Sequence, residues 1–153
     1  MTMIRKAVAI TVLAAIGGPA AAAPAKGVEH LMCTFGPYER QVRFAMELIK
    51  GKPSYVAFWN SSGAFRCSFD AKRDDAMSNW SDYGDNTLIT LLRGKGSALI
   101  QKERHGYLIR VQELDRMPFC GTQGEITGIL TLVRQKGGKA SCDWQGPYAK
   151  DDD

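Results

Sequence analysis

Apolar and polar residues alternate along most of the chain from residue 27 onward, and this period of two is typical of β-strands. In one segment, Val42, Phe44 and Met46 are separated by polar or small residues, which predicts one buried and one solvent-facing side. Such segments predict about eight strands, at 42–48, 55–59, 65–69, 87–92, 98–102, 107–112, 125–134 and 140–144. In the longest segment, 125–134, apolar side chains occur at both parities, so we expect burial on both of its faces.

Turn-forming residues separate neighbouring strand segments and predict a meander of hairpins. They occupy 60–63, 94–96, 105–106 and 137–138. The stretch 70–80 differs, because Asp70 can cap a first turn and Arg73, Met77 and Trp80 follow at helical spacing. We therefore expect an all-β fold, an antiparallel barrel or sandwich of about eight strands with one short helix. The pattern does not choose between barrel and sandwich.

The first residues have the layout of a secretory signal peptide: Arg5 and Lys6 precede an apolar run at 7–16 and then small residues. The apolar run is shorter than the roughly 20 residues of a membrane span, so we expect no span. The first cysteine, Cys33, lies well beyond the run and outside any Leu-x-x-Cys lipidation motif, so we expect no lipid anchor. We predict a signal peptide over 1–23, cleaved between residues 22 and 25, and a periplasmic or secreted protein. A single β domain over 27–148 and an acidic, disordered tail over 149–153 complete the expected organisation.

Four cysteines follow the leader, and an even number in an oxidising compartment predicts two disulfides. Three pairings are possible, and we favour Cys33 with Cys67 and Cys120 with Cys142 because neighbouring partners close the shorter loops. No Cys-x-x-Cys spacing is present, so neither a metal site nor a redox pair is expected. The chain has 20 basic and 16 acidic residues, a balance that does not indicate a nucleic-acid partner.

The sequence contains no pattern of an activated nucleophile. His30 and His105 lie apart, with no Gly-x-Ser-x-Gly motif, and we interpret both as surface histidines. The stretch 70–86 holds five aspartates but lacks the ligand spacing of a calcium loop. We expect its acids on a solvated face, with Trp80 and Tyr83 packed on the sheet, and we expect no enzyme activity, metal or cofactor.

Two parts of the chain resemble a known family. Cys33 is followed by the strand sequence Val42-Arg43-Phe44, and residues 78–83 (SNWSDY) are followed by 93–98 (RGKGSA). These segments resemble the start and the signature of the bacterial periplasmic inhibitors of animal c-type lysozyme, which are small, exported, disulfide-bonded β-barrels. In that family, a serine and a lysine enter the lysozyme cleft. The resemblance thus implies a basic role for Lys95 or Arg93.

The same resemblance implies a hydroxyl role for Ser78 or Ser81, with Tyr83 packing between the hydroxyl and the basic residue. Our hypothesis is that the chain is an exported, non-enzymatic protein that binds a protein partner. The most specific version of this hypothesis names a c-type lysozyme as the partner. A second hypothesis is a barrel that binds a small apolar ligand in a pocket lined by aromatic residues at strand spacing. Those residues are Phe58, Trp59, Phe65 and Phe69. A third is an envelope accessory or immunity protein.

Overall fold

The computed structural model describes residues 27–147 except 63, 113, 123 and 137–138, and contains two antiparallel β-sheets. The first sheet has four strands in the order β1-β2-β3-β4. Their bounds are Val28–Phe35 (β1), Arg40–Ile49 (β2), Lys52–Ser62 (β3) and Phe65–Lys72 (β4). The predicted signal peptide and acidic tail lie outside the described residues.

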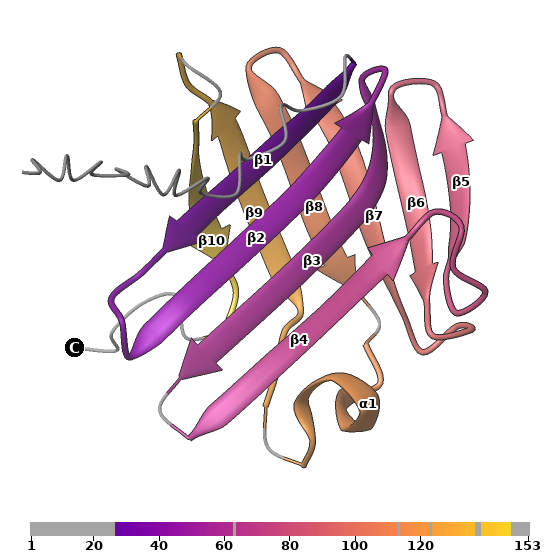
Figure 1. The fold of residues 1–153 in the computed structure, drawn as a ribbon. Helices are drawn as coiled ribbons and strands as arrows, with labels where there is room; N and C mark the ends of the chain where they lie inside the picture. The colour runs from indigo at the N-terminus through magenta and orange to yellow at the C-terminus, as the bar shows by residue number, and fades with distance from the viewer. Residues whose placement is uncertain (1–26, 63, 113, 123, 137–138, 148–153) are drawn as a thin grey trace, which may run out of the picture.

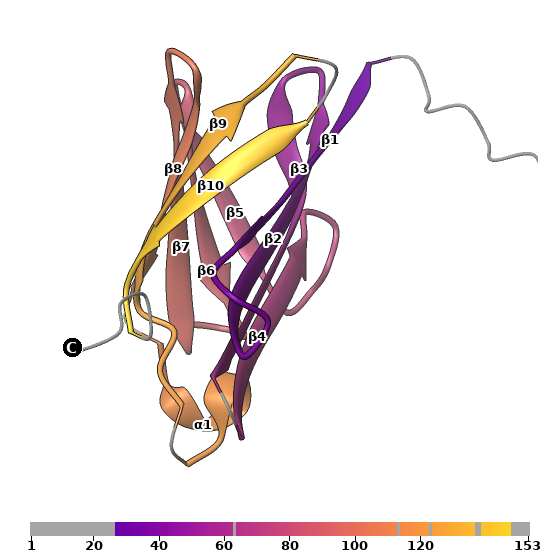
Figure 2. The same ribbon diagram turned by 90° about the vertical axis from the view of Figure 1, so that its left-hand side faces the viewer.

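The second sheet has six strands in the order β10-β9-β8-β7-β6-β5. Their bounds are Asn79–Tyr83 (β5), Asn86–Leu91 (β6), Gly96–Glu103 (β7), Gly106–Gln112 (β8), Gly128–Arg134 (β9) and Ala140–Gln145 (β10). The two sheets face each other as the layers of a sandwich, and helix α1 (Arg116–Cys120) lies at one end (Figures 1 and 2). The predicted all-β class is confirmed, and a sandwich fits the two open sheets.

The core fills the space between the sheets. In the first sheet, strand register places Cys33, Phe44, Phe58 and Phe69 in one row across all four strands, and all are buried. The ring of Phe58 lies 5.0 Å from that of Trp144 on β10, measured between centroids. The period of two therefore directs one row of apolar side chains from each sheet into a shared layer.

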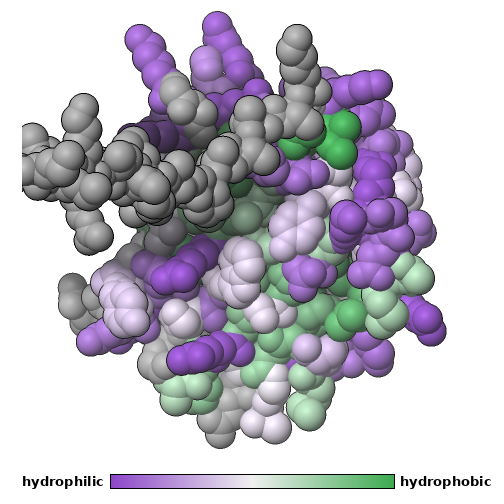
Figure 3. Space-filling model, in the orientation of Figure 1, coloured by the Kyte–Doolittle hydropathy of each residue, from purple (hydrophilic) through white to green (hydrophobic). Residues whose placement is uncertain are grey.

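The outer face of the four-stranded sheet is less polar than strand alternation predicts. Met32 and Trp59 are exposed on this face, and between them lie Ala45 and Ala57, which are opposite each other in register. In the space-filling view, pale and green side chains gather over the centre of the sheet, with hydrophilic ones along the right-hand side (Figure 3).

The strand predictions hold better than the helix prediction. Each predicted strand segment lies in or overlaps an observed strand, but β1 and β5 were not predicted. The helix predicted over 70–80 is wrong: β4 continues to Lys72, a turn follows, and Asn79 begins β5. Pairing of β4 with β3 and of β5 with β6 outweighs the local helical spacing, and the observed helix begins after Asp115, whose side chain caps it.

Strand β9 also differs from expectation. Leu130 and Leu132 face the core, whereas Val133 is 41% exposed, so the expected burial on both faces is wrong. A sandwich leaves the outer face of each sheet to solvent, and β9 follows that rule.

The predicted disulfide pairing is wrong. The structure joins Cys33 of β1 to Cys142 of β10 and Cys67 of β4 to Cys120 of α1, with Cα separations of 5.8 and 4.1 Å. Cys33 and Cys67 lie on the two edge strands of one sheet, with β2 and β3 between them. Three strand spacings of about 4.8 Å separate their Cα atoms by at least about 14 Å, beyond the reach of a disulfide. Sheet topology therefore overrides the preference for short loops.

Proteolysis without reduction should yield one fragment pair linked through Cys33 and Cys142 and another linked through Cys67 and Cys120. Replacing Cys33 and Cys142 together by alanine should lower the free energy of unfolding by about 2–5 kcal/mol, as measured by urea denaturation. This bridge closes the longer of the two disulfide loops and therefore restricts the unfolded chain more. A fragment linking Cys33 to Cys67 would contradict the observed connectivity.

Candidate functional site

The turn between β6 and β7 carries the two basic residues that the sequence singled out. The carbonyl of Leu91 accepts hydrogen bonds from the N–H groups of Gly94 (3.0 Å) and Lys95 (2.9 Å). The turn has positive φ at Leu92 (43°), Arg93 (56°) and Gly94 (97°). Glycine adopts this region freely, whereas each L-residue with a side chain pays about 1–2 kcal/mol there. Backbone strain is thus concentrated at Leu92 and Arg93.

Lys95 and Arg93 differ in their surroundings. The Nζ of Lys95 lies 3.1 Å from Oδ2 of Asp115, and the N–H of Asp115 donates to the Lys95 carbonyl at 2.6 Å. Lys95 is therefore held against the start of α1. Arg93 is exposed, and its guanidinium has no ion pair or hydrogen bond within the described part of the chain. Of the two predicted basic residues, Arg93 is the one free to meet a partner.

Of the predicted hydroxyl and packing residues, Ser78 directly precedes β5, and Ser81 and Tyr83 lie within it. Ser78 lies beside the turn, because the N–H of Arg93 donates to the carbonyl of Met77 at 3.2 Å. The Ser78 hydroxyl donates to the carbonyl of Lys72 (3.0 Å) and accepts from Nε1 of Trp80 (2.9 Å), so two internal bonds already engage it.

Ser81 and Tyr83 lie farther from the turn. Ser81 is half-buried in mid-strand, and Tyr83 ends β5 opposite Asn86 and is 63% exposed. At about 3.3 Å per residue, Tyr83 lies about 16 Å from Ser78 along the strand. The structure therefore brings Ser78 and Arg93 together, but it does not place Tyr83 between the hydroxyl and the basic residue.

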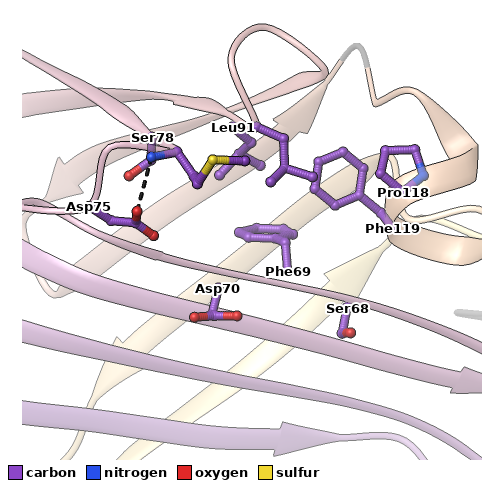
Figure 4. Close-up of a pocket in the computed structure, with 10 residues that line it drawn as sticks. Ser68, Phe69, Asp70, Asp75, Ser78, Leu91, Pro118 and Phe119 are labelled. Carbon is purple, nitrogen blue, oxygen red and sulfur yellow. Dashed lines mark hydrogen bonds between the residues drawn. The ribbon is translucent and has the colours of Figure 1, made fainter.

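A hollow of about 250 Å³ opens beside the turn, between the edge of β4, the loop before β5, the end of β6 and α1 (Figure 4). Its walls are mostly apolar, with two carboxylates. The lining residues are Ser68, Phe69, Asp70, Asp75, Met77, Ser78, Leu91, Leu92, Pro118 and Phe119. The sequence did not reveal this hollow, because four separate segments line it and none carries a motif.

The aromatic residues proposed to line an interior pocket do not share one. Phe58 and Phe69 stack in the core with centroids 5.7 Å apart, whereas Trp59 and Phe65 are exposed. Neighbouring residues of a strand point to opposite faces, so Phe58 and Trp59 cannot line one cavity. That part of the ligand-binding hypothesis is wrong.

Asp82 anchors the acidic segment. Its carboxylate accepts two hydrogen bonds from Arg73, at 2.9 and 3.1 Å, and one from the hydroxyl of Thr87 at 2.9 Å. The Nζ of Lys52 lies 3.4 Å from Oδ2 of Asp82. The hydrogen bonds from Arg73 are the main cause that lowers the pKa of Asp82 to about 2. This cluster ties the end of β4 to β5.

The aromatic residues of the acidic segment behave differently from each other. Trp80 packs against the core, with the Arg73 guanidinium 5.1 Å from its ring, as expected for the sheet-packing residue. Tyr83 is exposed, so the prediction that it packs on the sheet is wrong.

Among the described residues, no group of three or more His, Cys, Asp or Glu side chains is placed to hold a metal ion.

Both histidines are exposed, as predicted, and Nδ1 of His30 lies 3.7 Å from Oε2 of Glu47.

Within the described residues, no helix is long and apolar enough to cross a membrane. Comparison of the chain with models of protein families, with curated proteins and with solved structures found no match.

Asp82→Asn should lower the free energy of unfolding at pH 7 by about 1–2 kcal/mol, because it removes a charge-assisted pair that solvent partly screens. The pKa of Asp82 in the folded state lies below the ordinary aspartate value of 3.8. This stabilisation is therefore present above about pH 4 and is lost as the pH falls toward 2. Urea denaturation across this range measures the difference. Asp74→Asn, at an exposed pair with Lys72, is the control and should change little. A difference that persists at pH 2 would contradict this account.

Arg93→Gly should raise the free energy of unfolding by about 1 kcal/mol, since glycine accepts positive φ and no described side-chain contact is lost. Urea denaturation measures the gain. Lys95→Gly, at a position without positive φ, removes the pair with Asp115 and should not stabilise the protein. Loss of stability in Arg93→Gly would indicate that Arg93 has a structural role.

Proposed function

We propose that this chain is an exported, non-enzymatic binding protein whose contact surface is centred on Arg93. The observation that carries the proposal is an exposed guanidinium that has no partner among the described residues and lies on a turn with a strained backbone. Such strain concentrates at functional sites, where it holds a side chain in place for a partner. The two disulfides fit a periplasmic or secreted protein.

The chemistry of Arg93 favours an acidic partner. A guanidinium binds a carboxylate through two parallel hydrogen bonds, which gives both strength and orientation. Met77 is exposed, and its carbonyl accepts the N–H of Arg93, so it supplies apolar surface next to the charge. An arginine beside apolar surface is a common composition for the centre of a protein interface.

The most specific partner that we propose is a c-type lysozyme. Its active-site cleft contains a pair of carboxylates, which a basic side chain can occupy. Because Lys95 is paired with Asp115 and the Ser78 hydroxyl is engaged internally, we assign the basic role to Arg93. An envelope accessory or immunity protein would use the same surface for a different acidic partner.

The purified, oxidised protein should slow cell-wall lysis by a c-type lysozyme, and Arg93→Ala should weaken inhibition at least tenfold. Lys95→Ala should retain most inhibition because its charge is already paired. Arg104→Ala is the matched control, since Arg104 is exposed in the turn at the other end of β7.

No inhibition by the unmodified protein at high molar excess would exclude c-type lysozyme as the partner. Equal loss in the Arg93 and Arg104 variants would instead indicate a general effect of positive charge and would overturn the role of the turn.

A further inference from the structure

Strand β4 is an edge strand, and the directions of its backbone groups follow from two hydrogen bonds. The N–H of Arg73 donates to the carbonyl of Ser54, which continues the register of β4 with β3. The carbonyl of Lys72 instead accepts from Asp75 and Ser78, away from β3. Backbone groups alternate in direction along an antiparallel strand, so residues of even number in β4 direct N–H and C=O to the free edge.

Ser68 and Asp70 are even-numbered residues that line the hollow. Their backbone N–H and C=O groups have no hydrogen-bond partner within the described residues. Unpaired groups on an edge strand form a template for another extended chain. Here α1 and the loop before β5 limit the opening to about these residues (Figure 4).

The side chains around this edge form two different surfaces. The ring of Phe69 points toward Phe119 and Leu91, whereas the side chain of Ser68 points away from them (Figure 4). The Phe69 and Phe119 rings meet edge to face, 6.4 Å between centroids. A strand added to β4 would therefore place the residue opposite Phe69 in the apolar hollow and the residues on either side of it on the outer face.

The charges on the outer face favour a basic residue in that chain. Asp70 is exposed and has no ion pair among the described residues. The carboxylate of Asp75, at the mouth of the hollow, accepts the N–H of Met77 and likewise has no ion pair there. The neighbouring cation Lys72 is already paired with Asp74, at 3.4 Å. A lysine or arginine beside Asp70 would form a cross-strand ion pair.

We propose that the edge of β4 is a second binding site, which takes an extended segment of another polypeptide by strand addition. The segment has an apolar residue opposite Phe69 and a basic residue opposite Asp70. Backbone hydrogen bonds to Ser68 and Asp70 supply affinity, and the hollow and the carboxylate supply specificity. This site adjoins the surface centred on Arg93 and shares Met77 with it, but Arg93 itself does not line the hollow.

Amide hydrogen exchange with a labelled seven-residue peptide that alternates leucine and lysine tests the proposal. Peptide binding should slow exchange at Ser68 and Asp70 at least tenfold and leave Phe69 and Ala71 unchanged, because those N–H groups already bond to β3. Absence of added protection at Ser68 and Asp70 at millimolar peptide would overturn the proposal.

Two pairs of variants locate the peptide. Met77→Glu places a charge in the hollow and should weaken binding at least tenfold, whereas Met32→Glu, at an exposed methionine on β1, should not. Asp70→Lys should abolish binding of the lysine peptide and allow binding of a peptide with glutamate in place of lysine. Asp143→Lys, at an exposed aspartate on β10, should behave as the unmodified protein does. Equal losses in the two methionine variants, or loss of binding in Arg93→Ala, would place the peptide elsewhere and overturn the proposal.

Discussion

Apolar packing between the two sheets is the interaction on which the rest of the structure depends, and Phe58 lies near its centre. The Phe58 ring contacts Trp144 of the opposite sheet and stacks on Phe69, which in turn meets Phe119 of α1. Once Phe69 faces this layer, strand geometry turns Asp70 to solvent and directs its backbone groups away from β3. The core thus determines which chemical groups the edge of β4 presents.

The fold class can be predicted from sequence because strand alternation is local, and the pattern of Val42, Phe44 and Met46 predicts their burial without a structure. The way in which the strands connect is harder to predict. The spacing of Arg73, Met77 and Trp80 indicates a helix, yet Arg73 binds Asp82 and stacks over Trp80 in a strand-turn-strand arrangement. Pairing with distant strands decided the outcome, and a short window of sequence does not contain it.

The candidate site divides in the same way. Gly94 and its neighbours predict a basic turn from sequence alone. They do not predict which basic residue is free to bind, because Lys95 is paired with Asp115, which lies 20 residues farther along the chain. The hollow and the open edge of β4 depend on four segments and on the direction of backbone groups, which side-chain identity does not encode. Motifs therefore predicted the location of the turn, and tertiary contacts assigned its chemistry.

The disulfide connectivity has a consequence for how the chain matures. Synthesis runs from the N-terminus, so Cys33 and Cys67 are the first two thiols to emerge, and neither is the native partner of the other. The native partner of Cys67 is Cys120, which is synthesised 53 residues later, and that of Cys33 is Cys142, which is synthesised 109 residues later. A chain oxidised during emergence meets the wrong pair first and reaches the native one by thiol–disulfide exchange. Its yield therefore depends on a disulfide isomerase, or on oxidation that is delayed until β10 is complete.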